Sequence, residues 1–265
     1  MRVVCRSQDS QEWFSARVGK VTASCIYDAT KFVDKGSKVR GDKRRGSSAV
    51  RAAYISELAW GLISRVPIEH FVSRAMDLGK QYEKMARAEY AFRFCPDEAI
   101  ERTGFVLHPT LDFFGASPDG YTKAGGVELK VPQFRMHKTL LETDVVPEAW
   151  AFQCYGNMLC LEKESWDFAS FLPCDEQFGA EAVAMPDEFR MYRKRFYRDE
   201  ELFKRMEEGA TATMEEAIRL VETLRERYSG SPKSNVLKMQ LKASLSAEEA
   251  MQDAADFIDS YDVTP

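Results

Sequence analysis

The sequence has few of the residues that build zinc centres or disulfide frameworks, and it has no long apolar run. None of its six cysteines forms a C-x-x-C pair, and its three histidines stand apart from any partner at zinc-ligand spacing. We therefore expect reduced cysteines that mostly lie in the core. No apolar stretch reaches the roughly 18 residues of a membrane-spanning helix, and no signal-peptide pattern opens the chain. These absences predict a cytoplasmic protein without a membrane contact.

The composition is that of a soluble globular protein, but its charge is unevenly spread. The 265 residues are 45% hydrophobic and 30% charged, and the formal net charge is -5. Within this acidic chain, residues 35–48 carry six basic residues and one acidic residue. A basic loop can contact phosphates even on an acidic protein, and Arg40, Lys43, Arg44 and Arg45 are the candidate DNA contacts. A solvated loop without a ligand is the alternative, and it has equal weight at this point.

Hydrophobic periodicity predicts helices towards both ends of the chain and strands between them. Helical spacing or capping signals mark residues 11–17, 49–64, 73–94, 147–161 and 185–208, a segment that begins at a Thr213/Glu216 capping box, and residues 246–258. Strand patterns mark residues 100–108, 113–116, 120–122, 126–131 and 166–172. This order predicts an α/β fold in which helices flank a mixed central sheet, with a helical C-terminal extension. A break rich in Gly, Ser and Pro predicts a main domain over 1–228 and a linker with an acidic helix over 229–265.

The stretch SPDGYTKAGGVELK, residues 117–130, carries the pattern with the clearest chemistry. Alternate residues of a strand share a face, so Glu128 and Lys130 point the same way while Leu129 points into the core. A Gly-Gly turn signal folds the stretch into a hairpin, which brings Asp119 close to Glu128. Mg²⁺ prefers one or two carboxylates plus phosphate oxygens, so this cleft suits metal-dependent cleavage of a phosphodiester. The alternative is an exposed hairpin with an ordinary Glu–Lys ion pair.

Five segments, in order along the chain, resemble those of one nuclease family. They are SARVGKVTAS at 15–24, MDLGKQYEKMAR at 76–87, GASPDG at 115–120, VELKVP at 127–132 and AFQCYGNML at 151–159. In these segments the chain resembles phage lambda exonuclease and the related YqaJ-type viral recombination nucleases of the PD-(D/E)XK superfamily. The resemblance covers roughly residues 8–175 and implies a restriction-endonuclease-like core. It does not extend to the basic loop or to the helical C-terminus.

The resemblance implies a metal site. Asp119, Glu128 and the backbone carbonyl of Leu129 would bind Mg²⁺, and Lys130 would position and activate the attacking water. Glu83 would bind a second Mg²⁺, giving two ions in each active site, for which Mn²⁺ can substitute. Two metals would hold both the attacking and the leaving oxygen of an in-line displacement. Without the resemblance, Glu83 is better interpreted as a surface helix residue paired with an arginine four positions later.

The resemblance also implies a pocket for a terminal 5′-phosphate, formed by Arg17, Ser24 and Ser117. A guanidinium forms paired hydrogen bonds with phosphate oxygens, and hydroxyls complete the set. Such a pocket measures the distance from a 5′ end to the scissile bond, so it makes an exonuclease out of an endonuclease core. Gln153 matches a glutamine beside the active site of the family. The alternatives are a helix-surface arginine, a capping serine, a turn serine and a helix-face glutamine.

The resemblance implies a Mg²⁺-dependent, processive 5′→3′ exonuclease that acts on double-stranded DNA ends carrying a 5′-phosphate. It would release 5′-mononucleotides and leave 3′ single-stranded overhangs for phage homologous recombination inside a bacterial host cell. The family also implies a homotrimeric ring around DNA and a phage single-strand annealing protein as partner. The alternatives are a PD-(D/E)XK endonuclease of restriction type and a catalytically silent DNA-end-binding module. An iron–sulfur nuclease of this superfamily is disfavoured because four grouped cysteines are missing.

Overall fold

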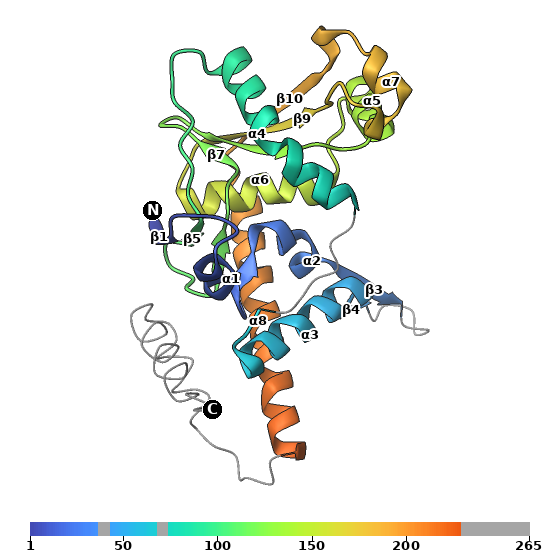
Figure 1. The fold of residues 1–265 in the computed structure, drawn as a ribbon. Helices are drawn as coiled ribbons and strands as arrows, with labels where there is room; N and C mark the ends of the chain where they lie inside the picture. The colour runs from blue at the N-terminus through green and yellow to red at the C-terminus, as the bar shows by residue number, and fades with distance from the viewer. Residues whose placement is uncertain (37–42, 68–73, 229–265) are drawn as a thin grey trace, which may run out of the picture.

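The computed structural model describes residues 1–36, 43–67 and 74–228, which form the layered fold of Figure 1. Two four-stranded sheets each contain both parallel and antiparallel neighbours, and helices cover their faces. The prediction of an α/β fold with a mixed sheet and flanking helices is confirmed, although the strands divide between two sheets. The predicted linker and acidic helix over 229–265 lie outside the described residues.

One sheet has the strand order β10-β9-β8-β7, in which β8 and β9 are parallel and the other neighbours are antiparallel. Its strands are β7 (Gly120–Tyr121), β8 (Gly126–Lys130), β9 (Ser165–Phe171) and β10 (Met191–Tyr197). Helices α4 (Arg74–Phe94) and α6 (Glu148–Leu161) cover its opposite faces. Leu129 packs with Tyr90 of α4, whereas Phe168 stacks on Trp150 of α6. The alternation predicted for residues 126–131 therefore holds, with Leu129 in the core.

The other sheet has the order β1-β5-β6-β2. Its strands are β1 (Arg2–Cys5), β2 (Val21–Thr22), β5 (Phe105–Leu107) and β6 (Phe114–Ala116). Helix α1 (Gln11–Arg17) contacts β1 and β5, and η1 (Ala23–Cys25) leads into α2 (Ile26–Thr30). A Cβ added at Gly156 would lie 2.8 Å from the Cβ of Ala23, so a glycine there lets α6 approach η1 closely. Helix α6 contacts strands of both sheets and joins the two halves of the fold.

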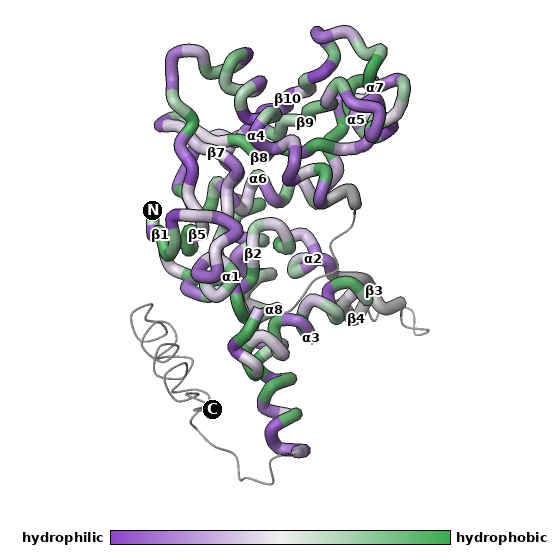
Figure 2. Tube along the Cα trace, in the orientation of Figure 1, coloured by the Kyte–Doolittle hydropathy of each residue, from purple (hydrophilic) through white to green (hydrophobic). Residues whose placement is uncertain are grey.

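The last described element, α8 (Glu200–Tyr228), is one helix of 29 residues that packs on α2 and α3 (Ala49–Ser64). Hydrophobic and hydrophilic residues alternate along it (Figure 2), as expected of a helix with one buried face. Arg51 of α3 is fully buried, where it pairs with Glu216 of α8 at 2.9 Å and donates to the Ala29 carbonyl at 2.9 Å. These contacts fasten the helical extension to the body of the fold.

The basic segment is not a plain loop. Strands β3 (Phe32–Gly36) and β4 (Lys43–Ser47) pair antiparallel, so the predicted loop is wrong over the described residues. A short charged strand lacks the apolar alternation by which strands are recognised in a sequence. Lys43, Arg44 and Arg45 lie on β4, and Arg40 lies outside the described residues.

Two predictions near the C-terminus are wrong. Residues 185–208 form η3 (Asp187–Phe189), strand β10 and only the start of α8. Thr213 lies inside α8 and caps nothing; its hydroxyl donates to the Ala29 carbonyl at 2.8 Å, while Glu216 pairs with Arg51. Further elements lie where none is predicted from the sequence: β1, α5 (Phe134–Thr143), η2 (Glu176–Phe178) and α7 (Ala180–Ala184).

The six cysteines divide between the core and the surface. All six cysteines are unpaired, and Cys5, Cys154 and Cys160 are buried. Within the described ranges, no helix is both long enough and apolar enough to span a bilayer.

The Thr213 contact can be measured with a matched pair of threonines on α8. Thr213→Val removes a buried hydrogen bond, and because Arg51 still donates to the same carbonyl, the free energy of unfolding should fall by about 0.5–1.5 kcal/mol. Thr223→Val removes an exposed bond to the carbonyl of Arg219 and should change it by less than about 0.5 kcal/mol. Urea denaturation of both variants gives the comparison. Equal effects would show that the Thr213 hydroxyl contributes nothing to the α2–α8 contact.

Candidate active site

The β7–β8 hairpin brings the carboxylate of Asp119 to strand β8. Gly120 pairs antiparallel with Val127, as the turn signal predicts. At the open end of this hairpin, the Leu129 amide donates to Asp119 Oδ2 at 2.7 Å. A Cβ at Gly126 would lie 2.3 Å from the ring of a buried tryptophan on β9, so only glycine fits at the start of β8. The hairpin therefore holds one acidic side chain beside the strand that carries the other.

Glu128 and Lys130 share one face of β8 and contact each other. Glu128 is only 1% exposed, and Lys130 Nζ donates to its Oε1 at 2.7 Å. The same ammonium donates to Gln153 Oε1 of α6 at 3.1 Å. Asp119 joins this group because it accepts a hydrogen bond from Leu129, the residue between Glu128 and Lys130. The structure thus brings together four predicted residues, which are Asp119, Glu128, Lys130 and Gln153. Gln153 meets the lysine directly, as its predicted place beside the site requires.

Asn157 is a residue of this site that the sequence analysis does not identify. It is fully buried on α6, one turn beyond Gln153, and its Nδ2 donates to Glu128 Oε2 at 3.0 Å. Among the described residues, its Oδ1 finds no hydrogen-bond partner. Gln153 and Asn157 of α6 therefore orient Lys130 and Glu128 through hydrogen bonds. Their spacing of four residues within the apolar run AFQCYGNMLC is the signal that could have indicated a shared polar face.

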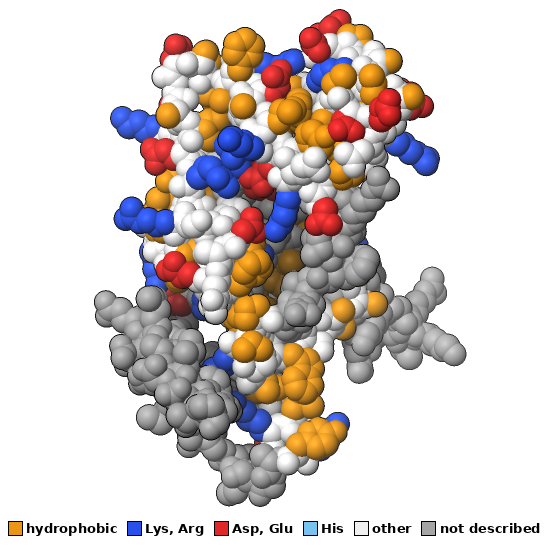
Figure 3. All heavy atoms as spheres, in the orientation of Figure 1, with side chains coloured by type: hydrophobic (Ala, Val, Ile, Leu, Met, Phe, Trp, Pro, Cys, Tyr) orange, Lys and Arg blue, Asp and Glu red, His pale blue; other side chains and the backbone are white. Residues whose placement is uncertain are grey.

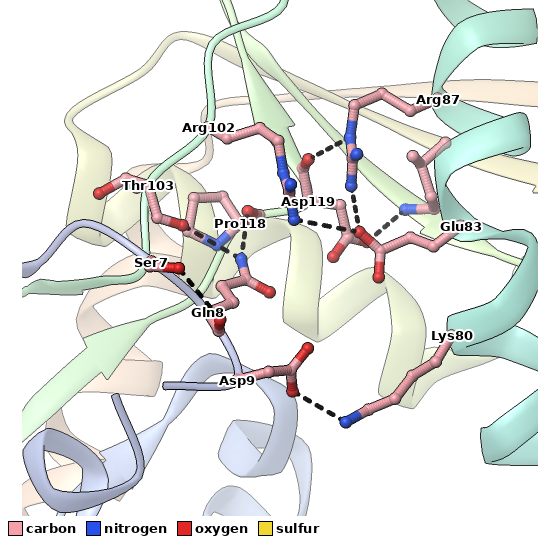
Figure 4. A network of polar contacts seen from close by, with 11 residues as sticks. Ser7, Gln8, Asp9, Lys80, Glu83, Arg87, Arg102, Thr103, Pro118 and Asp119 are labelled. Carbon is pink, nitrogen blue, oxygen red and sulfur yellow. Dashed lines mark hydrogen bonds and ion pairs between the residues drawn. The ribbon is translucent and has the colours of Figure 1, made fainter. Parts of the chain in front are cut away.

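Glu83 reaches the same region from α4, and both interpretations of it find support in the geometry. Its Oε1 forms an ion pair with Arg87, four residues later, as expected for a helix pair. Arg87 Nε donates at the same time to the backbone carbonyl of Asp119 at 2.9 Å (Figure 4). Arg102 Nη2 lies 3.8 Å from Glu83 Oε1. One arginine therefore ties the predicted second-metal residue to the predicted first-metal residue.

The charges of the site perturb one another strongly. Burial raises the pKa of Asp119 well above its ordinary value, and the neighbouring Glu128 and Glu83 carboxylates raise it further. Burial opposes the charged form of Lys130, but the carboxylates of Glu128 and Asp119 outweigh it, so the pKa of Lys130 is raised. Lys130 is therefore an ammonium at neutral pH, beside a crowded pair of acids.

This donor set fits a cation that takes few protein ligands. Among the described residues, no group of three or more His, Cys, Asp or Glu side chains gathers closely enough to hold a metal by itself. Mg²⁺ does not need such a cage, because it keeps several waters and is usually bound by one or two carboxylates plus substrate phosphates. Burial and the repulsion from neighbouring carboxylates raise the pKa of Asp119, and a bound divalent cation would offset both effects. Asp119 and Glu128 therefore suit Mg²⁺ better than a metal with four protein ligands.

Two of the three residues predicted to bind a 5′-phosphate, Arg17 and Ser117, contact each other. Ser117 Oγ accepts hydrogen bonds from Arg17 Nη1 at 3.0 Å and from the Trp13 indole at 2.8 Å. The Arg17 guanidinium lies over the Trp13 ring, 4.3 Å from its centroid. Across the described ranges, no carboxylate comes within ion-pair distance of Arg17. A half-buried guanidinium that lacks a carboxylate partner is suited to bind an anion.

Ser24 joins this pocket less directly. It lies in η1, and its Oγ is 3.0 Å from Thr22 Oγ1. Burial lowers the pKa of Arg17, and Cys25, the residue after Ser24, is the strongest of the groups that oppose this shift. The structure therefore brings Arg17 and Ser117 into contact, whereas Ser24 is hydrogen-bonded to Thr22.

Comparison with known proteins identifies one family and one group of solved structures. The model of the YqaJ-like viral recombinase domain matches residues 12–164. A search of curated protein sequences finds no match. Among solved structures, LHK-Exo in complex with dAMP is 27% identical, with a TM-score of 0.69 over 83% of this chain and 99% of that chain.

Two further solved structures support the fold. The alkaline exonuclease LHK-Exo from Laribacter hongkongensis is 28% identical, with a TM-score of 0.67 over 83% of this chain and 99% of that chain. A phage-related exonuclease from Haemophilus somnus 129PT is 16% identical, with a TM-score of 0.59 over 77% of this chain and 96% of that chain. This last likeness concerns the fold alone.

The raised pKa of Asp119 predicts that its ionised form destabilises the protein when no metal is bound. The cost is absent below the pKa of an unfolded aspartate, about 3.9, and is complete once the pH exceeds the raised folded-state pKa. Asp119→Asn, measured in EDTA, should therefore raise the free energy of unfolding at pH 8 and leave it unchanged near pH 4. Asp97→Asn is the control, because Asp97 is an exposed aspartate in the turn after α4. A less stable Asp119→Asn protein at pH 8 would contradict the predicted charge crowding.

Proposed function

This chain belongs to the YqaJ-like viral recombinase family, and from that membership and the geometry of the site we propose that it is a recombination exonuclease. It acts on ends of double-stranded DNA in the 5′→3′ direction and depends on Mg²⁺. The observation that carries this proposal is that Ser117 and Asp119 lie two positions apart in the sequence, on one turn. One of these residues contacts the uncompensated guanidinium of Arg17, and the other belongs to the acidic cleft.

In the proposed reaction, Asp119, Glu128 and the Leu129 carbonyl would hold Mg²⁺, and Glu83 would hold a second ion. When bound, Mg²⁺ supplies stabilisation of the negative charge that builds up on phosphate oxygens. Lys130 is charged at neutral pH, so it donates hydrogen bonds to the attacking water or to the scissile phosphate. Gln153 accepts from the same ammonium and keeps it aimed into the cleft.

The direction of digestion follows from the Arg17 pocket. A terminal 5′-phosphate would replace the missing carboxylate partner of Arg17, with the Ser117 hydroxyl beside it. Because Ser117 and Asp119 flank Pro118, the end of the strand and the scissile bond stay at a fixed separation. This separation supports release of 5′-mononucleotides, which leaves a 3′ single strand. LHK-Exo, crystallised with dAMP, binds a molecule of the class that such digestion releases.

We also propose that three copies form a ring around DNA and that a phage single-strand annealing protein takes up the 3′ strand. A closed ring would keep the enzyme on its substrate between successive cuts. The exonuclease chemistry does not depend on either assembly.

Lys130→Ala tests the chemistry. Loss of the charged donor should reduce Mg²⁺-dependent nucleotide release from linear duplex by about 10²-fold or more. Binding of the same duplex in EDTA should persist, because the pocket residues are unchanged. Lys163→Ala is the control, since Lys163 follows α6 and donates to the Lys123 carbonyl in the β7–β8 turn, at the end of the hairpin away from the acids. Digestion at the wild-type rate by the Lys130 variant would remove this residue from the mechanism.

Arg17→Ala tests the end pocket. The ratio of digestion rates on 5′-phosphorylated and 5′-hydroxyl duplexes should fall towards one, because the variant loses the positive charge that contacts Ser117. Arg17→Lys should restore the preference in part, since an ammonium keeps the charge but loses the planar fork. An unchanged ratio in Arg17→Ala would locate end recognition elsewhere.

A further inference from the structure

We propose that Lys80 and Arg102 bind backbone phosphates of the strand that is being cleaved, on its way from the Arg17–Ser117 pocket to Asp119. The inference rests on the proposed function and adds to it the path of the strand across the cleft. On this face, basic and acidic side chains adjoin one another between α4 and the N-terminal loop (Figure 3).

Lys80 is held in place by a partner that a phosphate can replace. It lies on α4 one turn before Glu83, so both side chains leave the same side of the helix. Its ammonium pairs with Asp9 Oδ1 at 2.8 Å, and the two side chains are 59% and 57% exposed. An ion pair as exposed as this one contributes little to stability, because water and salt screen it. A phosphodiester carries the same charge as Asp9 and can take its place.

Asp9 lies beside the turn that joins the two parts of the site. The side-chain amide of Gln8 donates to the carbonyl of Pro118 at 2.8 Å, which fixes the N-terminal loop against the residue between Ser117 and Asp119 (Figure 4). A strand with its 5′ end at Ser117 and its scissile bond at Asp119 must pass this turn. Asp9 therefore occupies the edge of that path, where its carboxylate competes with phosphate for Lys80.

Arg102 approaches Glu83 from the opposite side. It belongs to the segment before β5, and Figure 4 shows it reaching towards Glu83 from the side away from α4. Its Nη2 is 3.8 Å from Glu83 Oε1, an oxygen that Arg87 already holds at a shorter distance. The Arg102 side chain is 53% exposed. The Glu83 carboxylate faces two guanidinium groups, so one positive charge is in excess. Arg102 is the more exposed of the two arginines and can contact a phosphate.

Binding of a fluorescent, 5′-phosphorylated linear duplex tests both residues. Anisotropy is measured over a series of salt concentrations, in EDTA so that no hydrolysis occurs. Lys80→Ala and Arg102→Ala should each weaken binding and reduce the slope of log K against log salt by about one unit, because each removes one phosphate contact. Lys80→Arg and Arg102→Lys keep the charge and should retain most of the slope.

Lys138→Ala is the matched control for Lys80→Ala. Lys138 is 52% exposed and pairs with Glu142 at 2.6 Å on α5, so it has the same kind of exposed ion pair in another part of the fold. Its replacement should leave both affinity and slope unchanged. Melting temperatures of all variants, measured beside the binding curves, identify any loss of affinity that comes from unfolding.

Asp9→Asn distinguishes a phosphate contact from a structural link between the N-terminal loop and α4. If Asp9 competes with phosphate for Lys80, Asp9→Asn should tighten binding while Lys80→Ala weakens it. If the pair only fastens the loop, both variants should shift the affinity in the same direction. Shifts of the same sign, or unchanged salt slopes in Lys80→Ala and Arg102→Ala, overturn the proposal, and so does a wild-type protein that does not bind the duplex. Failure of the wild type to digest DNA would instead overturn the nuclease, while the binding curves would still report on these two residues.

Discussion

The hydrogen bond from the Leu129 amide to the Asp119 carboxylate is the contact on which the rest of the site depends. At 2.7 Å it ties the residue before β7 to Leu129 of β8, so it sets the separation between the first acid and the Glu128–Lys130 pair. The bond is local, because ten residues and one tight turn connect its ends. The same turn carries Ser117 two residues upstream. A hairpin can therefore fix both the acidic residues and the serine of the proposed end pocket without help from distant parts of the chain.

The surroundings of this hairpin make an unfavourable charge arrangement tolerable. Glu128 is nearly inaccessible to water, and a buried carboxylate is costly unless it is paired and hydrogen-bonded. Lys130 neutralises one of its oxygens and Asn157 donates to the other. For Asp119, the Leu129 amide and Lys130 do not fully offset burial and the nearby carboxylates, so its pKa is raised. Sites that perturb pKa values in this way are frequently functional, since the strain is relieved when the ligand binds.

The sequence predicts the parts of this protein that are determined locally. The hairpin follows from a Gly-Gly turn and strand alternation, and helices α3 and α4 follow from their apolar spacing. Strand β10 escapes prediction because its run of arginine and lysine resembles a charged helix face. Its strand character depends on β9, where Arg195 bonds to the buried Asp167. Thr213 looks like a helix cap because its true partner, the Ala29 carbonyl, is 184 residues away.

The same division applies to the site. Asp119, Glu128 and Lys130 lie on one short stretch, so alternation and turn geometry bring them together before any tertiary contact is known. Asn157 reaches Glu128 from another helix, and nothing near it in the sequence indicates that partner. For Glu83 the sequence leaves two interpretations, a metal ligand and a helix residue paired with an arginine. In the structure Glu83 pairs with Arg87, and Arg87 also donates to the Asp119 carbonyl, so the helix pair lies beside the acidic residues.

The central claim is that the acidic residues cleave DNA at a fixed distance from its 5′ end. The most direct measurement is digestion of linear duplex labelled at a 5′ end or at a 3′ end, beside a closed circular duplex, with and without Mg²⁺. The account predicts Mg²⁺-dependent release of the 5′ label as a mononucleotide, while the 3′ label stays in a long single strand and the circle stays intact. Cutting of the closed circle, or early release of the 3′ label, would contradict it.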